Sequence, residues 1–120
     1  MMAALTAAER GRSVVLLEHE KFCGRKLRIT GKGRCNVCND CDVKTFLRNV
    51  PRNPKFLYGA LNRFSPAETM AFFESIGVPL KTERGNRVFP VSDRSFDISA
   101  ALERELRRLK VRLEIGRAHV

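Results

Sequence analysis

The sequence lacks any long apolar run, and this absence narrows the classes of protein to which it can belong. The apolar run Val14–Leu17 is far shorter than the roughly 20 residues of a membrane-spanning helix, and no other run approaches that length. Eight glycines and five prolines in 120 residues exclude a fibrous or low-complexity chain. Hydrophobic residues make up 43% of the chain, enough for a single globular core.

A signal peptide is also lacking. The chain starts MMAALTAAERGR, with no basic residue ahead of its apolar part and with an acid at Glu9. Secretory signals place positive charge first. We therefore predict no export, no membrane association and a cytoplasmic location, where the four cysteines would be reduced thiols.

Acidic residues are scarce, with 13 Asp and Glu against 23 Lys and Arg, for a net charge of +10. The excess forms two groups. One has no acid within it: Lys21, Arg25, Lys26, Arg28, Lys32 and Arg34. The other is expected on the solvent side of a helix: Arg104, Arg107, Arg108, Lys110 and Arg112.

Few aromatics interleave with the first group, the phenylalanines fit core positions, and no helix-turn-helix, RNP or KH signature is present. A basic nucleic-acid-binding module is thus only a third hypothesis, and no specific nucleic acid is expected.

The N-terminal third predicts the second half of a βαβ unit. An Ala-rich helix over Met1–Arg10 stops at Gly11, and a short buried parallel strand follows, ending in Glu18. The first strand of such a unit would precede Met1. The Gly-rich and basic segment Lys21–Asp42 has no clear period and is predicted to be irregular.

The remainder predicts helices around a hairpin. Helices are expected over Val43–Val50, over Pro54–Phe64, from a Ser65 capping box to Gly77, and after an N-cap at Ser95 or Asp97 with Ile98, Leu102, Leu106 and Leu109 on one face. The hairpin covers Leu80–Val91 with Gly85 and Asn86 at its turn, and Val111–Leu113 begins another strand.

The cysteines of GKGRCNVCNDCD suggest a metal site. Cys35, Cys38 and Cys41 have C-x2-C-x2-C spacing, and Cys23 could be a distant fourth ligand. However, the fourth cysteine and the proline of a ferredoxin run are absent, as is a second zinc knuckle. A small metal or iron–sulfur module is therefore the alternative hypothesis, and separate structural thiols are favoured over it.

The GKG letters of the same stretch suggest a phosphate-contacting turn. They do not fit the P-loop pattern, yet glycines beside Lys and Arg let backbone N–H groups approach a diphosphate. Glu18 ends the predicted strand, where an acid of a dinucleotide-binding fold accepts hydrogen bonds from ribose hydroxyls. A surface acid at a strand end is about equally consistent with this spacing.

Four stretches together resemble a known family. AALTAAERG with SVVLLE, GRKLRITGKGRCNVCN, NVPRNPKFLYGALNRFSP and FFESIGVPLKTERGNRVFPVSD are similar to the bacterial FAD-dependent oxidoreductases of the BaiN-like, aminoacetone-oxidase-like family. TGKGRCN and ERGNRVFPVS are the specific motifs. The resemblance implies an α/β, doubly wound, Rossmann-like FAD-binding domain, with FAD as cofactor, a small-molecule substrate, and NAD(P)H left open as electron donor.

The resemblance also implies roles for matching residues. Glu18 would bind the adenosine ribose, and Arg25 and Lys26 would lie near the diphosphate. The loop expected close to the flavin consists of Gly31, Gly33, Arg34, Cys35 and Asn36. The residues expected on the substrate side are Arg87, Phe89 and Pro90. No catalytic residue and no metal ligand are implied.

The sequence departs from the family in three places. The first strand and its glycine-rich turn are absent, Cys38 replaces a usual Thr, and the later substrate domain is not in the sequence. Residues 1–113 are therefore predicted to be a partial FAD-binding domain from a fragment that is inactive alone. Residues 114–120, EIGRAHV, match the translation of a common sequencing adapter and are predicted to be read-through, the alternative being an ordinary strand end.

Overall fold

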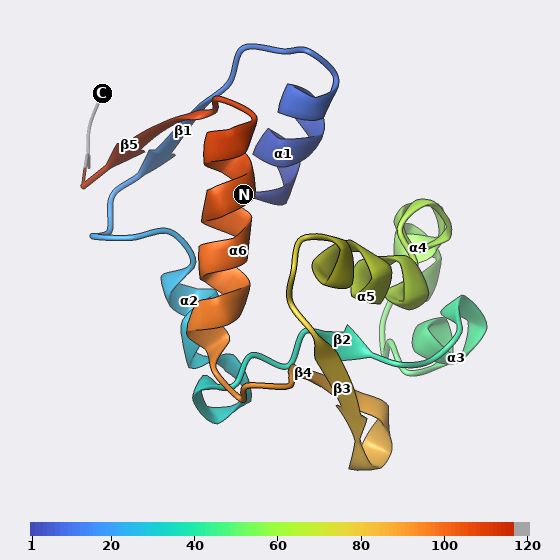
Figure 1. The fold of residues 1–120 in the computed structure, drawn as a ribbon. Helices are drawn as coiled ribbons and strands as arrows, with labels where there is room; N and C mark the ends of the chain where they lie inside the picture. The colour runs from blue at the N-terminus through green and yellow to red at the C-terminus, as the bar shows by residue number, and fades with distance from the viewer. Residues whose placement is uncertain (117–120) are drawn as a thin grey trace.

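The computed structural model describes residues 1–116 and contains two small sheets on either side of a long central helix, α6 (Figure 1). The helices are α1 (Met2–Glu9), α2 (Arg25–Ile29), α3 (Val43–Arg48), α4 (Tyr58–Arg63), α5 (Pro66–Ser75) and α6 (Ser95–Arg108). The strands are β1 (Val15–Glu18), β2 (Cys38–Asn39), β3 (Leu80–Glu83), β4 (Arg87–Pro90) and β5 (Arg112–Ile115). The short 3₁₀ helices are η1 (Thr30–Gly33), η2 (Pro54–Leu57) and η3 (Arg84–Asn86).

The first sheet confirms the predicted parallel strand. β1 pairs with β5 in parallel, from Val15 opposite Arg112 to Glu18 opposite Ile115. The expectation that β1 is buried was wrong: among the described residues 1–116, nothing covers one face of this strand. Val15 and Leu17 are 44% and 52% exposed, because the packed side chains lie on one face of the strand only.

The second sheet has the order β2-β4-β3 and is antiparallel, which confirms the hairpin. At its turn Gly85 and Asn86 have φ of 76° and 58°, the left-handed region that Gly and Asn adopt more readily than other residues. The two-residue strand β2 pairs Cys38 with Val88. The GKGRCN segment is therefore held beside β4 by backbone pairing just after it ends.

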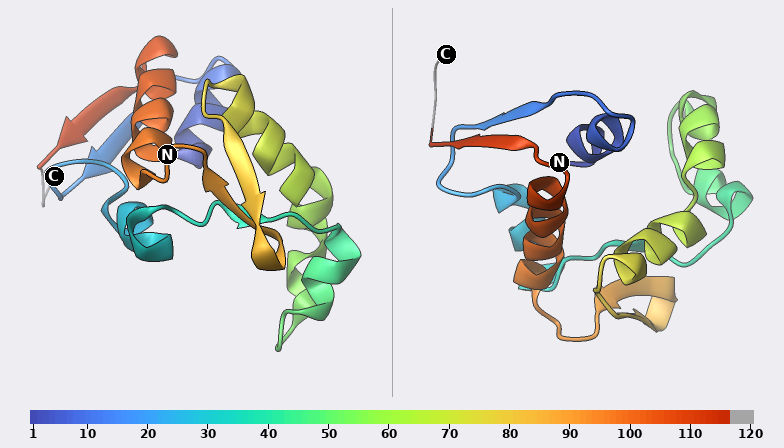
Figure 2. Two further views of the ribbon diagram at one scale, coloured as in Figure 1. Left: turned by 60° about the horizontal axis from the view of Figure 1, so that its bottom comes forward. Right: turned by 45° about the horizontal axis from the view of Figure 1, so that its top comes forward.

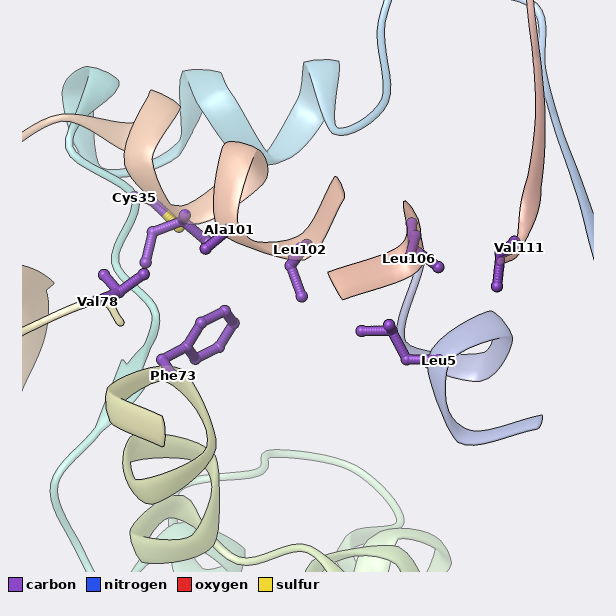
Figure 3. Packing of buried hydrophobic residues seen from close by; sticks show 9 residues of the cluster. Leu5, Cys35, Phe73, Val78, Ala101, Leu102, Leu106 and Val111 are labelled. Carbon is purple, nitrogen blue, oxygen red and sulfur yellow. The ribbon is translucent and has the colours of Figure 1, made fainter. Parts of the chain in front are cut away.

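The core lies along one face of α6, as its periodicity predicted. Ile98, Leu102 and Leu106 are buried, and Leu109 packs at the edge of the same cluster. Figure 3 shows side chains of α6 facing Leu5 of α1, Phe73 of α5 and Val111. All residues of the second basic group are exposed, as predicted, but only Arg104, Arg107 and Arg108 lie on α6, whereas Lys110 follows the helix and Arg112 begins β5.

Three local expectations were wrong. The segment predicted to be irregular contains α2, η1 and β2, and α2 is too short to show a period. Neither Ser95 nor Asp97 caps α6, since Arg94 is its N-cap and the Ser95 hydroxyl donates instead to the Arg28 carbonyl at 2.8 Å. Most phenylalanines are not core residues, and Phe56 is 86% exposed. The Ser65 capping box is confirmed.

The helices α3 and α4 lie at the end of the molecule away from β1 and β5 (Figure 2). No described helix has the length and apolar character needed to cross a bilayer. The predicted tail falls partly in β5, where Glu114 and Ile115 pair with β1, and partly outside the described residues, at 117–120. Its origin stays a prediction.

Candidate cofactor-binding site

A pocket of about 420 Å³ opens at the carboxyl end of β1. Its lining consists of Glu18, His19, Glu20, Gly24, Arg25, Lys26, Leu27 and Ile29. The structure thus brings together three residues that the sequence predicted as cofactor ligands, because the chain turns back after β1 and α2 begins beside it. His19, Glu20 and Ile29 were missed, since nothing in their spacing marks them.

Two acids, Glu18 and Glu20, and two cations, Arg25 and Lys26, line this pocket. One carboxylate oxygen of Glu18 accepts the backbone N–H of Glu20 at 3.0 Å, and no hydrogen bond to its other oxygen is found among residues 1–116. The Glu20 carboxylate forms an ion pair with Arg25. Lys26 is exposed and has no ion pair within the described chain. Within residues 1–116 the pocket therefore offers an unpaired carboxylate oxygen on Glu18 and an unpaired cation on Lys26, the kinds of group that a ribose and a phosphate require.

The GKG segment, directly after α2, folds into a tight turn with left-handed backbone angles. Gly31, Lys32 and Gly33 have φ of 56°, 57° and 85°. A Cβ placed on Gly31 would lie 2.7 Å from the Asn36 backbone nitrogen and 3.1 Å from the Phe89 ring. At Gly33 the same atom would meet nothing within 4 Å. Glycine is thus needed at Gly31 for close packing, and Gly33 leaves its backbone open to a ligand.

Arg34, the next residue, contacts three other parts of the chain. Its guanidinium carbon lies 3.8 Å from the centre of the Phe89 ring. Its Nη1 donates to both oxygens of Glu83, at 3.0 and 3.1 Å, and to Asp93 at 3.2 Å. The hydrogen bond to Glu83 raises the pKa of the Arg34 guanidinium, and Arg34 in turn lowers the pKa of Glu83. Sequence reasoning missed both acids, which lie 49 and 59 residues away.

The predicted substrate-side residues lie against this turn. Phe89 and Pro90 are buried in β4, whereas Arg87 is exposed, 5.8 Å from the Phe89 ring. With its amide oriented to donate, Asn36 bonds the carbonyls of Cys38 at 3.0 Å and Val88 at 3.3 Å. The residues predicted for the flavin loop and for the substrate side therefore lie around the GKG turn and β4. The helix α2 connects this part of the site to the pocket beside Glu18.

The cysteines do not come together as ligands. Within residues 1–116, no three His, Cys, Asp or Glu side chains are placed to hold a metal ion. Cys35 is 4% exposed and points into the core beside Ala101 (Figure 3). Burial raises the pKa of Cys23 and of Cys35, and it raises the pKa of Cys38 to about 11. Metal ligation and redox exchange both need the thiolate, so the burial of these thiols disfavours both.

Comparison with known proteins agrees with this geometry. Residues 1–119 match the family model described as "HI0933-like protein Rossmann domain". A 3-dehydro-bile acid delta(4,6)-reductase of Clostridium scindens is 35% identical over 118 residues, which are 97% of this chain and 28% of that reductase. The chain thus spans little more than a quarter of the length of this relative. The chain belongs to the HI0933-like, BaiN-like family of oxidoreductases, and its parallel β1–β5 sheet with flanking helices is part of a Rossmann-like, dinucleotide-binding α/β fold.

Proposed function

We propose that this chain forms part of the FAD-binding domain of a flavin-dependent oxidoreductase acting on a small organic substrate. The observation that carries the proposal is the pocket at the end of β1, where Glu18, Arg25 and Lys26 line one cavity. Its volume of about 420 Å³ suits one nucleoside and a phosphate, not a whole dinucleotide. FAD would therefore extend out of it, toward the GKG turn.

The donor set of the pocket fits the adenosine end of FAD. The unpaired oxygen of Glu18 would accept hydrogen bonds from the ribose hydroxyls. Lys26 would approach the diphosphate as a point charge, and Arg25 would first have to give up part of its pairing with Glu20. The pocket is thus built to orient a nucleotide, and it contains no group that the redox chemistry itself requires.

The GKG turn fits a flat ring passing close by. The backbone at Gly33 has open space beside it, and Gly31 lets the turn pack directly on Phe89. When bound, the flavin supplies the electron transfer. The residues of this chain would position it: Arg34 and Asn36 fix the turn, Cys35 anchors it in the core, and the exposed Arg87 would reach toward the substrate side.

The substrate is proposed only as a class. The Clostridium scindens relative is named as a reductase of a 3-dehydro-bile acid, and 28% of that protein is matched here. We therefore propose reduction or oxidation of a small organic molecule with flavin, with NAD(P)H as the candidate electron donor. We also propose that this chain is a fragment of the enzyme and is inactive by itself, because it spans 28% of the length of the reductase that it matches.

The test is the protein made from the complete open reading frame and refolded or purified with FAD. We expect a yellow protein with the absorbance of bound flavin. Glu18→Ala should weaken FAD retention about tenfold, as expected for loss of a charged hydrogen-bond acceptor. The exposed acid Glu74 on α5 provides the matched control, Glu74→Ala, which should leave retention unchanged. A colourless full-length protein would refute the assignment.

A further inference from the structure

We infer that Arg34 is a positioning residue, which holds the GKG turn against the β3–β4 hairpin, and that its guanidinium is not a ligand for the cofactor. We call Arg34 with its contacts Phe89, Glu83 and Asp93 the Arg34 clamp. The inference rests on contacts within the chain and does not require the proposed flavin function to be correct.

The clamp engages one face of the guanidinium and its Nη1. One face lies 3.8 Å from the Phe89 ring, and the edge meets Glu83 at 3.0 Å and Asp93 at 3.2 Å. A planar cation stacked on a ring and bonded to carboxylates is an arrangement that Arg forms and Lys cannot reproduce. The three partners come from β3, from β4 and from the segment after β4, so a single side chain ties the turn to the hairpin and its exit.

The charges of the clamp are balanced within the chain. Lys81 on β3 also bridges the two acids, 3.2 Å from Glu83 and 2.8 Å from Asp93. Two cations therefore face two carboxylates, and the local charge is balanced. A phosphate approaching Arg34 would meet the repulsion of both carboxylates. Lys26 and Lys32, which have no ion pair within the described chain, are better placed to meet a phosphate.

The turn needs such a restraint because of its backbone. Lys32 and Cys35, on either side of Arg34, have φ of 57° and 60°. Residues with a Cβ rarely adopt this region, and they remain there only where surrounding contacts hold them. Two contacts do so here: the clamp on the outside and the buried thiol of Cys35 on the inside. Releasing the clamp should therefore let the turn relax and expose Cys35.

Thiol labelling reads this exposure directly. We would treat the chain with 4,4′-dithiodipyridine and follow Cys35 and Cys23 separately by peptide mass spectrometry. Both thiols are buried, Cys35 4% and Cys23 1% exposed, and Cys23 precedes α2, outside the turn and the hairpin that the clamp joins, so it reports global unfolding. In Arg34→Gln we expect Cys35 to react roughly tenfold faster than in wild type while Cys23 changes less than about twofold, the signature of local opening.

Two variants sharpen the test. Glu83→Gln keeps the Asp93 pair and the stack on Phe89, so Cys35 should become reactive to a smaller extent. Arg84→Gln removes an exposed cation at the hairpin tip that takes no part in the clamp, and it should leave both thiols at the wild-type rate. Arg34→Lys should restore little protection, since it keeps the charge and loses the planar contacts.

Three results would overturn the inference. Cys35 and Cys23 could accelerate equally, which would mean global destabilisation. Wild-type Cys35 could already react as fast as in denaturant, in which case the clamp protects nothing. Finally, Arg34→Gln could lose FAD retention in the full-length protein with Cys35 still protected, which would make the guanidinium a direct ligand. A failure to bind FAD in wild type would refute the proposed function and leave the labelling result standing.

Discussion

Comparing Gly31→Ala with Gly33→Ala separates two effects of adding a side chain at a glycine, one conformational and one steric. At Gly31 both effects are expected. The first is conformational, because φ is 56° at Gly31, and an L-residue in the left-handed region costs about 1–2 kcal/mol. The second is steric, because the new Cβ would lie 2.7 Å from a backbone nitrogen and 3.1 Å from the buried Phe89 ring. Neither neighbour is the mobile end of a side chain, so overpacking should add about 1–3 kcal/mol.

Gly33→Ala isolates the conformational effect. Its φ is 85°, and its Cβ would meet nothing within 4 Å. Stiffening of the unfolded chain offsets about 0.4–1 kcal/mol of this cost in both variants, so Gly33→Ala should be destabilised by about 0–1.6 kcal/mol. Gly31→Ala should be destabilised by about 1–4.6 kcal/mol, because the steric effect adds to the conformational one.

Urea denaturation followed by circular dichroism measures both variants against wild type. The decisive quantity is the difference between their free energies of unfolding, which cancels errors of extrapolation common to both. If the free energy of unfolding of Gly31→Ala is lower than that of Gly33→Ala by about 1–3 kcal/mol, the result supports close packing at Gly31. Equal destabilisation of the two variants would refute it, because the contact with Asn36 and Phe89 would then carry no energy.

Two further predictions concern pH and metals. Arg34 lowers the pKa of Glu83, and Lys81 lowers the pKa of Asp93. The ionised carboxylates therefore stabilise the fold fully above the ordinary carboxyl pKa of about 4. This stabilisation is lost as the pH falls through the lowered pKa values. We expect Tm to fall below about pH 4, and to fall less in Glu83→Gln; an identical fall in both would place the acid sensitivity elsewhere. Metal analysis after anaerobic purification should find no stoichiometric zinc or iron, because no three His, Cys, Asp or Glu side chains within residues 1–116 are placed to hold a metal ion, and one metal per chain would instead support the cysteine-ligated module.

The sequence predicted the elements whose signals are local. The spacing of Ile98, Leu102 and Leu106 places α6 and its buried face correctly. The Ser65 capping box fixes the start of α5, and Gly85 with Asn86 marks the hairpin turn. Each of these signals is read within one or two turns of the chain, where hydrogen bonding and periodicity depend on neighbouring residues alone.

The sequence could not predict the elements that depend on distant contacts. The helix α2 has five residues, too few to be stable in isolation, and it forms where the Arg28 side chain donates to Ser99 at 2.8 Å. The partners of Arg34 lie far along the chain, and no spacing pairs them. Cys35 was expected near the flavin, and its side chain is buried in the core, so it would act there through its backbone.

The two halves of the candidate site therefore depend on different parts of the fold. Glu18 is placed by β1, whose register against β5 fixes where the strand ends and the pocket begins. The GKG turn is placed by the hairpin, through Arg34 and through the close contact of Gly31 with Phe89. A perturbation of the hairpin should consequently move the turn and leave the Glu18 pocket intact. Because α2 connects the two halves and is held on α6 by Arg28 and Ser95, α6 sets the distance between them. A ligand that spans both halves, as a dinucleotide would, thus depends on the packing of α6 as much as on the residues it touches.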